Sequence, residues 1–556
     1  MRFILKYRLT TILLLISAAV YSQDPKQEPT PGSLTEEIEV VRPYKPVLAD
    51  AVKIRRNPDL TTTRPFKPNL TYNIIDKKLE LNTGIRELQA QKLPEERPDV
   101  LLNNYAKIGL GNLNTGLGEL YIGTGEDIAL QAGVYVKHLS QSGDITKQRF
   151  SNQSLGVFGR SIGDIHTVTG RASFDQRSSY FYGFNPAIPS TTDPDKQRFN
   201  LIEAEGEFFN NYSDEADLFN YALKASGYLL SNINDGRENS IALSTYLNKA
   251  FNNFNIGLNA SADFTGTKDT QYSIGNHILR GNPYVKFQGN GFLLNLGLNI
   301  VQEMGDNSRT NILPAASVEL PISAEYAIVF AGFKGDVLKS SLRDFSYENL
   351  FLNNNITIKN AVEKANAYAG VKGNAGAGFG YKVMAFYKKI EDMPLFVNNS
   401  VDVNRFDVIY DDGEAKVIGF EGEINIKASD IFTVGGKVQM NQYDMESEKE
   451  AWFKPGFRIT SNLRANINSK LSFDGELLFN GDSYAKITDF TTTPPTENSS
   501  LRINSFMDLS AGAEYRLNNK FGIYARVNNI FGNQYQQYLY YPKLGLNIFG
   551  GLNYSF

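Results

Sequence analysis

The sequence predicts an all-β protein, a transmembrane antiparallel β-barrel of about 22 strands that follows a Pro-rich and largely non-regular segment. Three observations lead to this prediction. The chain opens with an export signal, residues 104–556 alternate between apolar and polar with a period of two, and no later run reaches the ~18 apolar residues of a membrane helix. In lipid, such an exported chain can satisfy its backbone groups only by closing a sheet on itself.

Residues 1–22 have the pattern of a signal peptide. Arg2, Lys6 and Arg8 form a basic start, the run from residue 9 to 20 is almost wholly apolar, and Ser22 ends a small-residue cleavage site. The run is short for a spanning helix, so a membrane anchor is the less favoured alternative. We therefore expect cleavage after residue 22 and a mature chain in the outer membrane of a Gram-negative cell.

Residues 23–103 are rich in Pro and charge, and they are predicted to form a periplasmic segment. Within it, Arg42-Pro43-Tyr44-Lys45-Pro46 recurs as Arg64-Pro65-Phe66-Lys67-Pro68. Proline fixes φ and removes a donor, so both copies should be extended, near polyproline II. The repeat is either a docking segment for a partner or part of a disordered spacer.

A short β-prone piece, Glu36-Glu37-Ile38-Glu39-Val40-Val41, precedes the repeat. An extended, unpaired segment with β-branched residues can be added as a strand to a partner's sheet. The alternative is a plain linker.

Residues 104–556 are predicted to form the barrel. Ile418, Phe420 and Ile424 share one face of a strand, and Glu421 and Glu423 share the other. Charges on the second face suit a wet lumen and would be costly against lipid. Divided over 22 strands, this length allows about 20 residues for each strand and its connection. The sequence therefore favours short connections, or else fewer and longer loops on a narrower barrel.

The last stretch, residues 544–556, is predicted to be the closing strand. Leu546, Ile548, Leu552, Tyr554 and Phe556 share one parity, so one face is mostly apolar and ends in two aromatic rings. We expect Tyr554 and Phe556 to serve as a signal for the barrel-assembly machinery, with outer-membrane lipid around the apolar face.

The segments before this strand resemble a known family. Asn529-Ile530-Phe531-Gly532 with Tyr535, the later Tyr541-Pro542-Lys543-Leu544-Gly545 and the terminal Phe556 are similar to the barrel end of TonB-dependent outer-membrane receptors. The resemblance implies transport of a solute, and it identifies residues 36–41 as a segment similar to the TonB box, which pairs with the periplasmic protein TonB. The Arg42-Pro43 pair directly after these residues departs from that pattern.

The sequence predicts that the plug domain of the family is absent. Only residues 42–103 separate the box-like piece from the barrel, and they lack the Arg-Gly and Asp-Gly landmarks of family plugs. A barrel of 22 strands without filling would leave a wide hole. The N-terminal segment, the loops with inward side chains, or a partner protein could close it.

Catalytic and metal-binding motifs are missing from the sequence. His138, His166 and His277 are far apart, and Asp411, Asp412 and Glu414 are expected in a solvated turn. We therefore expect no enzymatic activity, no metal and no cofactor. The small net charge of −4 argues against nucleic acid as a partner.

Two functions remain. The first is a receptor-type barrel that transports or passes a solute across the outer membrane. The second is a plug-less barrel that acts as a scaffold or assembly component for a periplasmic partner, which is TonB or another protein bound through residues 23–103.

Overall fold

The computed structural model describes residues 104–124, 129–186, 193–211, 219–251, 254–289, 291–306, 308–323, 326–375, 378–427, 431–489 and 496–556. The predicted signal peptide, the box-like piece at residues 36–41 and both copies of the Pro-aromatic repeat lie outside these described residues.

A single 22-stranded antiparallel sheet dominates the described chain, which confirms the predicted fold class. Its strands are β1 Tyr105–Gly111, β2 Thr115–Gly123, β3 Leu130–Ser142, β4 Arg149–Ile162, β5 His166–Tyr180, β6 Lys196–Asn210, β7 Phe219–Asn232, β8 Arg237–Phe251, β9 Phe254–Lys268, β10 Ser273–Gly289, β11 Phe292–Gly305, β12 Arg309–Ser323, β13 Ala327–Leu338, β14 Ala361–Asn374, β15 Phe379–Glu391, β18 Glu414–Lys427, β19 Phe432–Asp444, β20 Phe457–Asn466, β21 Leu471–Asn480, β24 Phe506–Arg516, β25 Phe521–Asn528 and β28 Asn547–Ser555.

The sheet closes into a ring because its first and last strands pair. Each strand pairs with the next ring strand along the chain, and β1 pairs with β28 through partners such as Ile108 and Leu552. Closure removes the free edges that an open sheet of this size would expose to lipid. The last stretch of the sequence is therefore the closing strand, as predicted.

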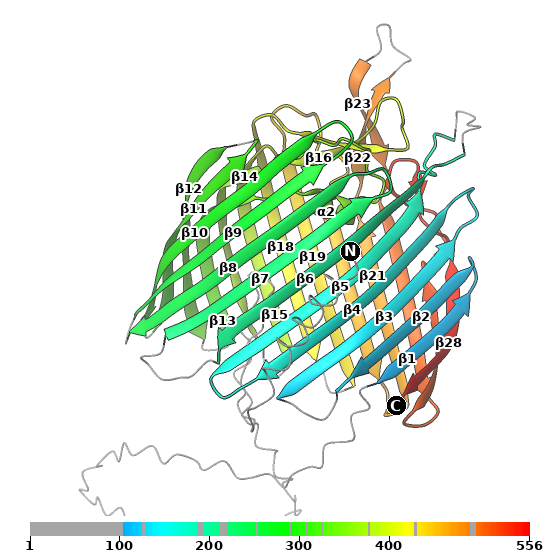
Figure 1. Cartoon of the computed structure of the whole chain (residues 1–556), viewed down its shortest axis with the longest axis horizontal. Helices are drawn as coiled ribbons and strands as arrows, with labels where there is room; N and C mark the ends of the chain where they lie inside the picture. Colours follow the sequence, from blue (N-terminus) through cyan, green and yellow to red (C-terminus); the bar gives the residue numbers. More distant parts are fainter. Residues whose placement is uncertain are drawn as a thin grey trace, which may run out of the picture. The chain divides into compact units, whose positions relative to one another are not determined.

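The two ends of the ring differ in their connections (Figure 1). One end carries short turns, whereas long loops at the other end hold the helix α2 Leu342–Glu348 and three hairpins, β16 Pro394–Asn398 with β17 Phe406–Tyr410, β22 Ser483–Asp489 with β23 Thr496–Ile503, and β26 Gln536–Tyr538 with β27 Tyr541–Pro542. Outer-membrane barrels have short periplasmic turns and longer extracellular loops, so the loop end is the extracellular end. The sequence suggested either short connections throughout or a narrower barrel with longer loops. The ring has 22 strands and both kinds of connection, because the short turns at one end leave enough chain for several long loops at the other.

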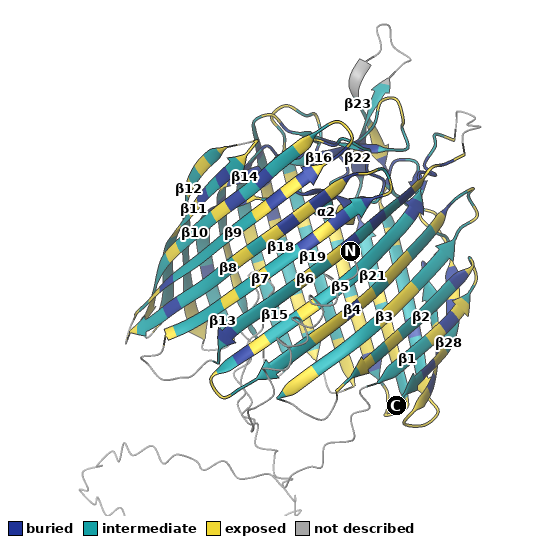
Figure 2. Ribbon diagram, viewed as in Figure 1, coloured by how far each residue is buried: buried dark blue, intermediate teal, exposed yellow. Residues whose placement is uncertain are grey.

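Exposed positions recur along the strands of the ring (Figure 2), and many of them carry large apolar side chains. On this outer face, aromatic rings lie close together near the periplasmic turns. The rings of Phe251 and Phe254 stack at 4.9 Å, and the ring of Tyr554 lies 4.6 Å from Phe521 and 5.4 Å from Phe556. Aromatic rings gather at this depth where a membrane strand meets the water interface. Within the described part of the chain, no helix is long and apolar enough to cross a membrane.

On the inner face, aromatic rings lie flat against glycines of neighbouring strands. A Cβ atom at Gly257 would meet the ring of Tyr284 at 2.2 Å, and one at Gly109 would meet the hydroxyl of Tyr524 at 2.0 Å. Any larger residue would displace these rings, which cover backbone that glycine leaves open. The lumen wall is therefore crowded at Gly109 and Gly257.

Candidate functional site

The lumen wall is charged, and its charges occur in cross-strand ion pairs. Lys437 lies 3.0 Å from both Glu421 and Glu423, and Arg526 lies 2.8 Å from Asp474. The alternation that assigned Glu421 and Glu423 to the lumen is thus confirmed, since Ile418 and Phe420 point outward and are exposed. Such a wall suits a water-filled lumen.

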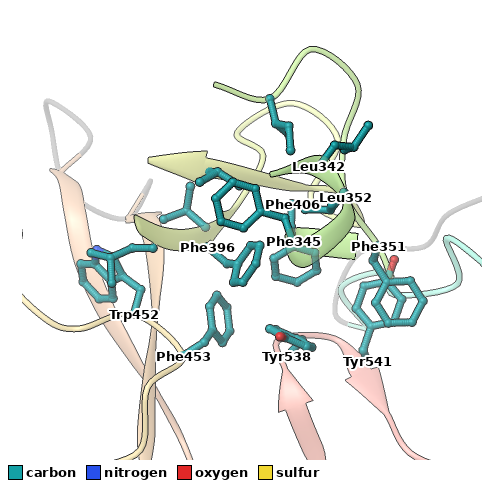
Figure 3. Close-up of a cluster of buried hydrophobic side chains, with 14 of the residues drawn as sticks. Leu342, Phe345, Phe351, Leu352, Phe396, Phe406, Trp452, Phe453, Tyr538 and Tyr541 are labelled. Atoms are coloured by element: carbon teal, nitrogen blue, oxygen red, sulfur yellow. The ribbon is translucent and has the colours of Figure 1, made fainter. Parts of the chain in front are cut away.

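The extracellular loops form a folded layer, which we call the cap. It comprises the described residues of 181–195, 339–360, 392–413, 445–456, 481–505 and 529–546. Figure 3 shows side chains from the loops of residues 339–360, 392–413, 445–456 and 529–546 converging on one apolar cluster. The cap therefore has a small hydrophobic core of its own, built mainly from connections.

The cap spans the barrel mouth. The loop of residues 181–195 follows β5, and the loop of residues 392–413 precedes β18. Around the ring, ten strands separate β5 from β18 in either direction. On one side these are β6 to β15, and on the other they run from β19 through β28 and β1 to β4. The two loops nevertheless touch, because Arg405 lies 2.8 Å from Asp195 and the Asn404 amide donates to the carbonyl of Phe181 at 2.8 Å. Loops that start on opposite walls can meet only by crossing the mouth.

The core of the cap is fully buried and rich in stacked rings. Trp452 and Phe406 have no exposed surface. The rings of Phe351 and Tyr541 stack at 3.7 Å, and Phe406 lies 5.2 Å from Tyr538. Each large apolar side chain re-exposed by opening the cap would cost about 1.5–3 kcal/mol. Any opening of the cap should therefore move packed groups of loops together and not single loops.

The barrel wall contributes to this core near the mouth. Phe199 and Leu201 on β6, with Tyr228 and Leu230 on β7, are buried against the cap. Lower on the same face of β6, Glu205 lies 2.7 Å from Arg171 and faces the lumen. The inward face of a single strand thus changes from charged to apolar where it meets the cap.

A buried carboxylate on the wall holds the helix of the cap. Glu238 on β8 is fully buried and accepts hydrogen bonds from the backbone N–H groups of Leu342 at 2.8 Å and Arg343 at 3.0 Å. The Ser341 hydroxyl caps the same helix by accepting from the N–H of Asp344. These contacts satisfy the free N–H groups that begin α2, and a negative charge there is favourable.

A second attachment joins the loop after β15 to the barrel wall and to a neighbouring cap loop. Asp392 accepts from the guanidinium of Arg309 at 3.0 Å and from Lys359 at 2.5 Å. Arg309 also lies 2.6 Å from Glu303, which is buried on β11. One ion-pair network therefore connects the wall, the loop of residues 339–360 and the loop of residues 392–413.

Asp411 ties two cap loops together, contrary to the expected solvated turn. It is fully buried and accepts from the backbone N–H groups of Glu446, Ser447 and Glu448 and from the Ser447 hydroxyl, at 2.8–2.9 Å. Burial by itself would raise the pKa of Asp411, but these four donors outweigh it and hold the pKa below its usual value. The expectation was wrong because sequence patterns identify a turn but not the loop that packs on it. No group of three potential metal ligands occurs among the described residues.

The segment that carried the family resemblance lies in the cap. The hydroxyl of Tyr541 donates to the carbonyl of Asn404, and the carbonyl of Pro542 accepts from Tyr182 at 3.1 Å and from Gln148 at 2.8 Å. Burial raises the pKa of Tyr541 well above its ordinary value, so its hydroxyl remains a donor. Sequence reasoning missed the cap, although the aromatic residues in loops between alternating strands were a signal for it.

Of the residues predicted to act in binding or assembly, the structure describes Tyr554 and Phe556 alone. Tyr554 and Phe556 lie at the periplasmic end and face outward, far along the strand from the cap. The histidines are placed singly, His138 on β3, His166 on β5 and His277 on β10. The box-like piece and the repeat are outside the described residues.

No protein-family model and no curated protein matches the sequence. Solved structures do match. The FrpB iron transporter of Neisseria meningitidis superposes with a TM-score of 0.62 at 11% identity, covering 82% of this chain and 82% of the transporter. This chain has the barrel fold of the TonB-dependent outer-membrane receptors.

Two further receptors with this fold show a similar relationship. The ferric-catecholate import receptor Fiu of E. coli K12 has a TM-score of 0.60 at 11% identity, over 82% of both chains. The FpvAI receptor in its complex with pyocin S2 has a TM-score of 0.61 at 12% identity, over 82% of this chain and 73% of that chain. At such identities the likeness to the TonB-dependent receptor fold concerns architecture, and it supports the outer membrane as the location.

Proposed function

We propose that this protein passes a polar solute across the outer membrane through its charged lumen and that the cap is the gate. The observation that carries the proposal is the contact of Asn404 and Arg405 with the opposite loop at Phe181 and Asp195. It places a packed layer across the mouth of an otherwise polar passage. The names of the structural neighbours describe iron or siderophore import, which supports a solute-transport function for this barrel.

Energy coupling would act through the N-terminal segment. In this proposal Glu36 to Val41 add a strand to a sheet of TonB, and the repeat at 42–46 and 64–68 docks on the same partner. A pull on this segment from the periplasm would reach the barrel through residue 104, next to the closing pair of β1 and β28.

The test uses the absence of cysteine from the natural chain. Asp195→Cys and Arg405→Cys would be combined in the full-length protein and joined with a flexible bismaleimide across the mouth. In planar bilayers with potassium chloride, we expect Phe406→Ala to produce channel openings because it loosens the cap, and we expect the cross-link to abolish them. Openings that persist in the cross-linked Phe406→Ala protein would contradict a gating role, and the two single-cysteine variants are the controls.

The second candidate function is a closed scaffold for a periplasmic partner. The fully buried Trp452 and Phe406 favour it, because a core of this kind suits a permanently shut mouth. In that case cross-linked cells would keep the full physiological activity of the protein. Loss of that activity on cross-linking would instead support the gate.

A further inference from the structure

On the outward surface of β4 to β7, the side chains change abruptly from apolar to polar towards the extracellular end. Leu155, Phe174, Ile202 and Leu229 are successive cross-strand partners and face away from the lumen. Leu155, Ile202 and Leu229 remain 46%, 53% and 55% exposed, as side chains in contact with lipid do. This row marks the edge of the lipid-facing belt on the side of the barrel that faces the viewer in Figure 1.

The next outward row towards the extracellular end is entirely polar. Two residues further along each strand, about 6–7 Å away, the cross-strand partners are Gln153, Gln176, Asn200, Ser231, Arg237 and Lys268. The change from apolar to polar therefore occurs on neighbouring strands at the same level of the ladder.

Five bases face outward at or above this polar row. We call them the basic shelf, which consists of Arg149, Lys196, Arg198, Arg237 and Lys268. The outward-facing positions of β4 to β9 contain no Asp or Glu in the described chain, because the carboxylates of these strands face the lumen or the cap. Acids next to the shelf lie in turns and loops. Asp235 is an exposed turn residue 3.9 Å from Arg237, and Asp195, which precedes Lys196, pairs with Arg405 in the cap.

The opposite wall is built differently. On the outward faces of β15, β18 and β19, Lys389 lies 2.8 Å from Glu414 and Lys416 lies 3.7 Å from Asp444. Lys364 is likewise 3.0 Å from Glu391. At the extracellular end, the basic residues on β14, β15 and β18 are thus paired with carboxylates. The basic residues of the shelf on β4 to β9 have no carboxylate beside them on the outward wall.

We propose that the basic shelf binds the phosphate groups of a phosphorylated lipid of the outer leaflet. The continuity of the two rows identifies the occupant, because acyl chains that cover Leu155, Ile202 and Leu229 end where the bases begin. A soluble anion would gain nothing from the apolar row below. Near an anionic membrane surface, each base strengthens binding about fivefold. The shelf would also fix how the barrel is oriented among its lipids, independently of what passes through the lumen.

The test compares two full-length variants in detergent with bisphosphorylated lipid A as the probe. The shelf variant carries R149Q, R198Q, R237Q, K196Q and K268Q, and the control carries K364Q, K389Q and K416Q on the opposite wall. We expect native mass spectrometry to show lipid A binding weakened at least about a hundredfold in the shelf variant and little changed in the control. Equal weakening in both variants, or in neither, would overturn the proposal.

Two further experiments complete the test. The first distinguishes a lipid from free phosphate, and the second applies if the shelf variant does not fold. Inorganic phosphate at the lipid concentration should not displace lipid A, and displacement would rule out a lipid as the occupant. If the shelf variant lacks the heat-modifiable migration of an assembled barrel, the wild-type protein is titrated with salt. Near 1 M salt the screening length falls to about 3 Å, so lipid A should be released, and retention of lipid A would contradict the shelf.

Discussion

Glu238 on the barrel wall and Leu342 at the start of the cap helix are joined by a 2.8 Å hydrogen bond from the Leu342 N–H to the Glu238 carboxylate. The same carboxylate accepts from Tyr228 and from Thr267, at 2.8 and 2.6 Å. Glu238, which has no exposed surface, thus joins side chains of the neighbouring wall strands to a loop that lies over the mouth. Attachments of this kind are what any opening of the cap must break.

Glu238→Ala should loosen the cap while the barrel remains assembled. The N–H groups of Leu342 and Arg343 would lose their acceptor, at a cost of about 1–3 kcal/mol. Faster hydrogen exchange or proteolysis within residues 339–360, with unchanged heat-modifiable migration, would show this. Glu207→Gln on the lumen wall is the matched control, and similar exchange in both variants would refute the anchor.

Phe406→Ala should expose the core of the cap. Removing a fully buried aromatic side chain costs about 3–5 kcal/mol. Trp452 is the only tryptophan in the sequence and is buried beside this core, so its fluorescence reports on the cap alone. We expect red-shifted emission and easier acrylamide quenching. The lipid-facing change Ile241→Ala should leave the emission where it is, and an unshifted spectrum for Phe406→Ala would contradict the packing.

The cap should tolerate mild acid because of Asp411. The pKa of Asp411 in the folded state lies below its ordinary value of about 4, so its contribution is complete above that value and is lost as pH falls through the folded pKa. Trp452 emission should therefore be constant from pH 7 to about 5 and change only below about pH 4. Asp411→Asn should weaken the cap at neutral pH and flatten this acid response. A transition of the wild-type protein centred near pH 6 would point to other groups.

Phe556→Asp should impair assembly more than the activity of molecules that do assemble. Phe556 stacks on Tyr554 at 5.4 Å on the outward face, and a charge there would meet lipid at the interface. Outer-membrane levels measured by heat-modifiable migration should fall. Ser555→Asp places the same charge at the neighbouring inward-facing position and is the control, so equal levels for both variants would argue against an outward aromatic signal.

Val40→Pro should weaken binding of a peptide spanning residues 33–46 to the C-terminal domain of TonB. Proline removes a backbone donor from the added strand, whereas Val40→Thr keeps both the donor and the β-branch. Calorimetry of the three peptides would measure this. Loss of affinity with Thr but not with Pro would indicate a side-chain contact instead, and a wild-type peptide that does not bind would leave residues 36–41 as a linker.

Much of the ring could be predicted because the evidence for a strand is local. The parity of Ile418 and Glu421 follows from a period of two, and it fixes which side chain meets lipid. The cap could not be predicted in this way, since Arg405 and Asp195 are brought together by ring closure and not by any repeat between them. The local sequence of Asp411 predicts a turn residue. Its burial depends on the loop of residues 445–456, which follows later in the chain.

The pairing of Ile108 with Leu552 also has a consequence for biogenesis. These partners lie near opposite ends of the barrel sequence, so β28 must have been synthesised and exported before the last ladder of hydrogen bonds can form. Until then β1 offers an unpaired edge, which is open to chaperones and prone to aggregation. Contacts at such sequence separation also form slowly. Biogenesis should therefore show a long-lived, protease-sensitive intermediate that converts in one step to the resistant barrel when β28 arrives.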